Sequence, residues 1–228
     1  MTPFHQQAVL LIVLWLALVA VRFRRSTPIL VGGLVAVGLL TLAALARGGV
    51  SASALGLGPP RSWLATLAFA LAGLAVMLAA SPLADRLATG WFAKPPTLGA
   101  FRGLQQSRLK LIAGVVVAWI LGGVLEELAF RGVLLQAVQA LAATRVAAPL
   151  AAAVAIAAAA GGAGIIHLYQ GPRAAVIITQ LSALFGLLFV VSGRNLWAVI
   201  LCHGLYDTVA FVRFARGTSR YANLDRDS

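Results

Sequence analysis

Long apolar runs, separated by short polar segments, dominate the pattern along the chain. They cover residues 8–21, 29–46, 63–82, 109–142, 148–168, 173–191 and 195–214. A helix of about 20 apolar residues crosses the hydrocarbon core of a bilayer, where every backbone hydrogen bond has to be made within the protein. The pattern therefore predicts an all-α fold, a polytopic bundle of transmembrane helices.

The run 109–142 decides how many helices there are. As one helix it would be about 50 Å long, against a hydrocarbon thickness of about 30 Å, so it must tilt strongly or break. Gly122 and Gly123 are the obvious place for a break. A break gives about eight helices and brings Glu126 and His167 to one membrane side. An unbroken run gives seven helices. This number agrees better with the rule that basic loops lie on the cytoplasmic side, but it separates Glu126 from His167. We expect eight, with seven as the alternative.

Polar segments divide the chain into three parts. The linker GGVSASALGLGPPRSW, residues 48–63, lies outside the bilayer core because it is rich in glycine, proline and serine. The segment 81–110 holds Asp85 and is expected to include an interfacial helix. We divide the chain into N-terminal helices and linker without a motif (1–108), a core with the candidate chemistry (109–214) and a basic polar tail (215–228).

Composition excludes a soluble domain. The chain is 61% hydrophobic and 11% charged, with a mean hydropathy of +0.95. The net charge of +12 would indicate nucleic acid in a soluble protein. Here the basic residues lie between the apolar runs and in the tail, where they face anionic headgroups and set the topology. The predicted partner is the lipid bilayer, with no nucleic acid.

The expected location is a bacterial inner (plasma) membrane. Strong use of Ala, Leu, Val and Arg is typical of a chain from a GC-rich bacterial genome. The first apolar run has no basic residue before it and no small-residue cleavage site, so we expect a retained anchor rather than a signal peptide. The single cysteine, Cys202, excludes an intrachain disulfide.

Ionisable residues inside the apolar runs are the candidate chemistry. Glu126 and Glu127 lie in one run, His167 ends the next, and His203 and Asp207 lie in the last. Burying such groups at membrane depth costs a few kcal/mol each, and they usually mark a functional cavity.

Spacing separates the roles of the two glutamates. Glu127 and Arg131 are four residues apart, so they share a helix face and can form an ion pair. Glu126 points about 100° away from Glu127. One carboxylate is thus neutralised, while Glu126 can face a cavity, where a poorly solvated carboxylate suits a general base.

The two histidines extend the candidate site. His203 and Asp207 are also four apart and project from one face, and His167 precedes the sequence YQGP by one residue. A carboxylate, two histidines and an aspartate can activate water and stabilise an oxyanion, or can ligate zinc. The spacing also fits a purely structural alternative, in which ion pairs hold the helices together.

Three motifs, EELAFR (126–131), IIHLYQG (165–171) and HGLYD (203–207), resemble a known set in order and spacing. The set is E-E-x-x-x-R, F-x-x-x-H and H-x-x-x-N/D of the CAAX-protease and bacteriocin-processing family of intramembrane proteases. The resemblance covers about 109–214 and implies an endopeptidase that acts on a peptide or a membrane protein.

Roles follow from the resemblance. Glu126 would activate water, His167 would position it, and His203 and Asp207 would stabilise the oxyanion or complete a metal site. Family members are commonly called metalloproteases. The resemblance therefore allows two mechanisms, one with zinc held by Glu126, His167 and His203 and one without metal. Ala163 replaces the phenylalanine of the second motif. A charged Asp207 would stabilise an oxyanion poorly. The aspartate is instead expected to orient His203, to bind metal or to be protonated itself.

Two other functions fit the same residues. Paired intramembrane carboxylates and histidines also relay protons in transporters, although the chain lacks the internal repeats typical of those. A non-catalytic partner-binding or immunity protein is the other alternative, although every ionisable position of the motifs is retained.

Overall fold

The computed structural model describes residues 3–21 and 27–221, and all regular structure in these ranges is helical. The α-helices are α1 (Pro3–Val21), α2 (Thr27–Ala46), α3 (Trp63–Trp91), α4 (Arg108–Ala118), α5 (Gln136–Ala142), α6 (Ala148–Ile166), α7 (Pro172–Val191) and α8 (Leu196–Ala215). Seven helical segments of the described chain are long and apolar enough to cross a membrane. The predicted transmembrane helical bundle is confirmed.

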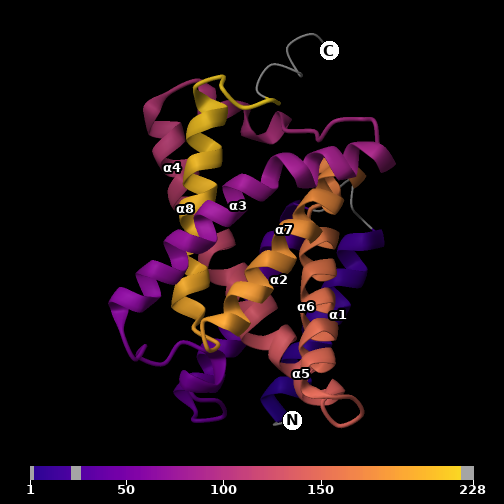
Figure 1. Ribbon diagram of the computed structural model, residues 1–228, viewed down its shortest axis with the longest axis vertical. Coiled ribbons are helices and arrows are strands. Elements are labelled where there is room, and N and C mark those ends of the chain that lie inside the picture. Colours follow the sequence, from indigo (N-terminus) through magenta and orange to yellow (C-terminus); the bar gives the residue numbers. More distant parts are fainter. Residues whose placement is uncertain (1–2, 22–26, 222–228) are drawn as a thin grey trace.

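The chain from Arg108 to Ala142 is one continuous helix. Two π-helical stretches, η4 (Trp119–Glu126) and η5 (Leu128–Leu135), join α4 to α5. The predicted break at Gly122 and Gly123 does not occur, and the bundle follows the seven-helix alternative. The excess length is accommodated by an oblique course, from α4 at the upper left of Figure 1 to α5 at the lower right.

An unbroken helix still brings the motifs together. Glu126 lies 16 residues before Ala142, where α5 ends, and His167 lies 19 residues after Ala148, where α6 begins. At 1.5 Å per residue these positions are about 24 and about 28 Å from the turn that joins the two helices. Because α6 runs back alongside α5 and η5, both residues reach the same depth (Figure 1). The expectation that seven helices separate Glu126 from His167 was wrong.

The polar segment 81–110 also differs from its prediction. Helix α3 continues through Pro82 to Trp91, so Asp85 lies inside a long helix and is buried. The only regular structure between α3 and α4 is a short 3₁₀ helix, η3 (Gly99–Gln105). This connection crosses the upper end of the bundle (Figure 1) and is tied to the α6–α7 turn by a backbone hydrogen bond from Thr97 to Gln170.

The helices form a layered bundle in which α3 crosses in front of α7 and α8 (Figure 1). Helices α6 and α7 pack as an antiparallel pair, and α4 lies beside α8. Small residues allow the close approaches: a Cβ on Gly164 would lie 2.0 Å from Thr179 Oγ1, and one on Gly204 would overlap the Trp119 ring. Such contacts are typical of helix packing in membranes.

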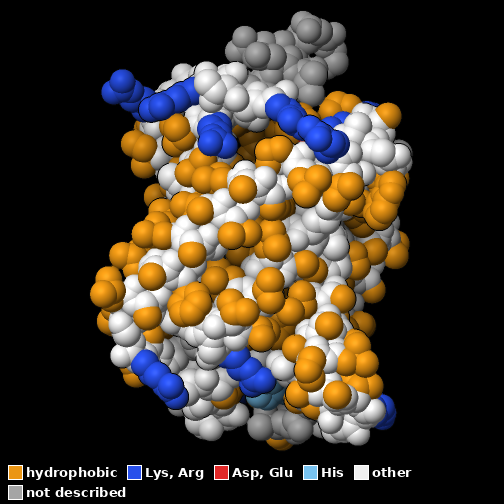
Figure 2. Space-filling view, viewed as in Figure 1, with side chains coloured by type: hydrophobic (Ala, Val, Ile, Leu, Met, Phe, Trp, Pro, Cys, Tyr) orange, Lys and Arg blue, Asp and Glu red, His pale blue; other side chains and the backbone are white. Residues whose placement is uncertain are grey.

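Basic side chains gather at both ends of the molecule, with a largely apolar surface between them (Figure 2). The end that carries the α3–α4 connection and the end of α8 has nine in the described chain: Arg86, Lys94, Arg102, Arg108, Lys110, Arg173, Arg213, Arg216 and Arg220. The opposite end has four: Arg47, Arg61, Arg145 and Arg194.

Candidate active site

A cavity of about 880 Å³ lies between α3, α4, α7 and α8. Its wall is mostly apolar, and four of its polar lining residues are those singled out from the sequence: Glu126, His167, His203 and Asp207. All four are half-buried, which leaves them accessible from the cavity. The structure therefore brings the three motifs together at one place.

Glu127 and Arg131 form a buried ion pair beside this cavity. Arg131 Nη1 lies 3.1 Å from Glu127 Oε1, and neither side chain is more than 1% exposed. Arg131 Nη2 also donates to the backbone oxygen of Ser182, at 2.6 Å, and to its hydroxyl. The arginine thus ties the long helix to α7. A buried charge of this kind is tolerated only while its partners remain.

Glu127 has a second partner that the sequence did not indicate. His203 Nδ1 lies 2.6 Å from the same oxygen, Glu127 Oε1. An ionised carboxylate can only accept, so Nδ1–H donates and Nε2 is left for the cavity. On its other side, His203 Nε2 lies 3.5 Å from Asp207 Oδ2.

Aromatic packing fixes the His203 ring further. The Phe185 ring stacks on it, with centroids 4.7 Å apart and planes at 22°. The Arg131 guanidinium lies 5.4 Å from the centroid of the same phenylalanine. The imidazole is therefore held at its edge by Glu127 and at its face by Phe185.

Gly122 has a role other than the predicted break. A Cβ at this position would lie 3.0 Å from Asp207 Oδ2 and 3.3 Å from His203 Nε2. A Cβ on Gly123 would meet nothing closer than 3.6 Å. Gly122 is thus the residue that lets the long helix approach the polar face of α8.

His167 is held by the backbone at the end of α6. Its Nδ1 lies 2.8 Å from the carbonyl oxygen of Ala163, and because that oxygen only accepts, Nδ1 donates. The Tyr169 ring stacks beside it at 6.1 Å, and burial raises the pKa of the Tyr169 hydroxyl. The replacement of phenylalanine by Ala163 leaves the histidine bond intact, since the bond uses the backbone.

Glu126 differs from its neighbour. In the described chain its carboxylate forms no hydrogen bond or ion pair, whereas Glu127 is shared between a guanidinium and an imidazole. The site thus contains one restrained carboxylate and one that faces the cavity unengaged.

The donor set does not fit a zinc site. Across residues 3–21 and 27–221, no three His, Cys, Asp or Glu side chains are placed to hold a metal ion. Glu126, His167 and His203, the candidate ligands, therefore do not converge as a zinc site requires.

Comparison with protein families agrees with the motifs. The model of a family described as type II CAAX prenyl endopeptidase, Rce1-like, matches residues 101–209, just under half of the chain. This segment belongs to the CAAX-protease family. The CAAX-protease segment runs from η3 into α8 and contains all the motif residues described above. No curated protein and no solved structure matches the chain significantly. Membership in the family supports a membrane-embedded protease.

Proposed function

We propose that the protein is an intramembrane endopeptidase that hydrolyses a peptide bond of a peptide or membrane-associated protein with water activated by Glu126. The observation that carries the proposal is the contrast between the two adjacent glutamates. Glu127 is held by Arg131 and His203, while Glu126 faces the cavity without a partner in the described chain. A carboxylate in a poorly solvated cavity is a suitable general base.

The first step is attack by water on the scissile carbonyl carbon. Glu126 takes one proton from the water as its oxygen bonds to that carbon. His167 positions the water through Nε2, because Nδ1 is occupied by the Ala163 carbonyl. The carbonyl oxygen becomes an oxyanion in the tetrahedral intermediate.

His203 stabilises that oxyanion. Glu127 and Asp207 flank the ring, and in the cationic form of the ring both nitrogens donate. The contact to Asp207 is long at 3.5 Å, so Nε2–H can donate to a closer acceptor in the cavity without any movement of the ring. Asp207 then holds His203 rather than binding the oxyanion itself.

Collapse of the intermediate completes the reaction. The carbon–nitrogen bond breaks, and Glu126 returns its proton to the leaving nitrogen, which yields a carboxylic acid and an amine. The base is thereby regenerated. The composition of the chain supports a bacterial plasma membrane as the place where this happens.

A peptide assay with matched variants tests the proposal. Purified protein in detergent is incubated with a peptide library, and new termini are identified by mass spectrometry. Glu126→Gln should lower turnover at least about a hundredfold, the usual worth of a general base. Asp227→Asn, which removes a carboxylate outside the CAAX-protease segment, is the control. Cleavage by Glu126→Gln at the original rate would falsify the mechanism.

The same preparation separates the alternatives. In proteoliposomes, a transporter would give substrate-dependent proton movement without new peptide termini. A partner-binding or immunity protein would give neither signal. Each of these outcomes contradicts the endopeptidase proposal.

A further inference from the structure

The chain turns back after α8 and covers one end of the cavity. Residues 216–221, here called the C-terminal strap, begin with a turn at Gly217, where φ is +71°. The backbone amides of Thr218 and Ser219 bond to the carbonyl of Arg213. Residues 218–221 then line the cavity together with Leu98 and Phe101 of the α3–α4 connection. The strap is therefore part of the wall at this end of the cavity.

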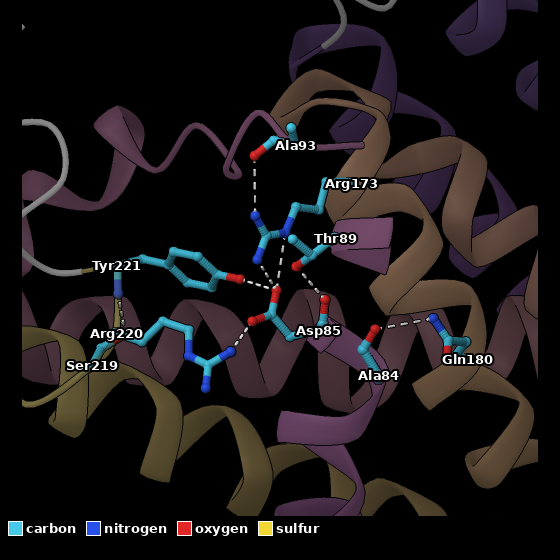
Figure 3. Close-up of polar contacts among 9 residues, drawn as sticks. All are labelled: Ala84, Asp85, Thr89, Ala93, Arg173, Gln180, Ser219, Arg220 and Tyr221. Carbon is cyan, nitrogen blue, oxygen red and sulfur yellow. Dashed lines mark hydrogen bonds and ion pairs between the residues drawn. The ribbon is translucent and has the colours of Figure 1, made fainter. Parts of the chain in front are cut away.

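Asp85 of α3 is the point to which the strap is attached (Figure 3). This carboxylate is buried and also lines the cavity. Arg220 Nη1 bonds to Asp85 Oδ2, and the Tyr221 hydroxyl donates to Oδ1. Burial and the hydrogen bond to Asp85 raise the pKa of Tyr221 to about 12, so the hydroxyl keeps the proton that it donates.

A second arginine serves the other oxygen of the same carboxylate. Arg173 of α7 donates to Asp85 Oδ1 from Nη2, at 2.6 Å, and from Nε, at 3.0 Å. Its Nη1 also donates to the carbonyl of Ala93. Figure 3 shows Arg173 and Arg220 approaching Asp85 from different elements. Oδ1 thus has a counterion from the bundle, and Oδ2 has one from the strap.

The two arginines differ in how firmly they are held. The Arg173 side chain is 10% exposed, and the Arg220 side chain is 56% exposed. A pair with an exposed partner is weak because water competes for it, whereas a buried guanidinium cannot leave its carboxylate cheaply. Release of the strap would therefore leave the Asp85–Arg173 pair in place and open Oδ2 to the cavity mouth.

The geometry points to a subsite for a cationic side chain at the cavity mouth. Asp85 Oδ2 binds a guanidinium there, and Arg220 fills the subsite in cis so that the strap closes the mouth. An incoming peptide with an arginine replaces Arg220 and takes the place of the strap at the mouth. The effect on peptide selection rests on the proposed function, while the subsite and the closure do not.

Thiol labelling tests closure without any need for peptidase activity. Cys202→Ala removes the single native cysteine, and Ala118→Cys adds one to the cavity wall. Arg220→Ala should raise the rate of modification by a charged thiol reagent about fivefold, as expected for loss of an exposed ion pair. Arg216→Ala, an exposed arginine of the same strap, is the matched control. An unchanged rate in Arg220→Ala protein would overturn the closure.

The subsite itself is tested by adding back the missing side chain. In Arg220→Ala protein, the blocked dipeptide acetyl-Arg-Tyr-amide should slow the labelling of Ala118→Cys, and acetyl-Gln-Tyr-amide should not. Equal effects of the two dipeptides would refute a cation subsite.

A peptidase assay separates this inference from the proposed function. If both hold, Arg220→Ala lowers KM for peptides that contain arginine. If labelling responds as stated but no peptide is cleaved, the subsite stands and the proposed function fails.

Discussion

His203 Nδ1 lies 2.6 Å from Glu127 Oε1, and this bond joins α8 directly to the helix that carries Glu126. The same oxygen accepts from Arg131 at 3.1 Å. A single buried carboxylate atom therefore links the first and third motifs. Glu127 is a positioning residue in this arrangement, since it acts on the substrate only through His203.

Glu127→Gln should lower both stability and turnover. The amide keeps the shape of the side chain but leaves Arg131 buried without its counterion, which costs about 3–5 kcal/mol. Thermal unfolding in detergent measures the first effect. A fall in kcat with little change in KM, together with a shifted pH profile, would report the loss of His203 orientation. Ser182→Ala removes only the hydroxyl acceptor of Arg131 and should cost about 1 kcal/mol.

An equal loss in both variants would contradict this account. If Glu127→Gln unfolds at the same temperature as Ser182→Ala, the ion pair is not structural. If its kcat and pH profile are those of the original protein, Glu127 does not position His203.

Two adjacent glycines provide a second, sharper comparison. A Cβ at position 122 intrudes on Asp207 Oδ2 and His203 Nε2, whereas a Cβ at position 123 makes ordinary contacts. Gly122→Ala should lower turnover about 10- to 100-fold, because displacement of a catalytic group by as little as about 1 Å has effects of this size. Gly123→Ala should remain close to the original activity. Comparable activity of the two variants would show that the close approach at Gly122 is unimportant.

These contacts show what the sequence could and could not predict. Apolar run length predicted the helices, and the i,i+4 spacing of Glu127 and Arg131 predicted their pairing. Spacing along one helix carries no information about partners on another, so the bond from His203 to Glu127 was missed. Gly122 suggested a break because glycine is common at kinks. Its actual role depends on where α8 lies, which is set by packing.

The sequence predicted the wrong surroundings for Asp85 for a related reason. Charged residues from Asp85 onward follow the apolar run 63–82, so the sequence indicated a polar segment. The helix continues because the charge of Asp85 is compensated by Arg173, 88 residues further along the chain, and by the C-terminal strap. A pattern confined to neighbouring residues does not contain such a partner.

Chelators test the side-chain mechanism. Because His, Cys, Asp and Glu side chains of the described residues do not form a group that could hold a metal, activity should be unchanged after dialysis against a strong chelator. Elemental analysis of the purified protein provides the independent readout. We expect a zinc content well below one ion per protein chain. Loss of activity on chelation that added zinc restores would show that Glu126, His167 and His203 bind metal in a rearranged site.

The distribution of basic residues predicts the orientation of the bundle in the membrane. The end with the C-terminal strap and the α3–α4 connection carries nine basic residues of the described chain, against four at the other end. Positive residues favour the cytoplasmic side, so the cavity mouth should open to the cytoplasm. Lys94→Cys and Arg145→Cys, on a Cys202→Ala background, place exposed thiols at opposite ends. In intact spheroplasts, an impermeant maleimide should label position 145 at once and position 94 only after permeabilisation. The reverse pattern would place the mouth, and the entry of substrate, on the outer side.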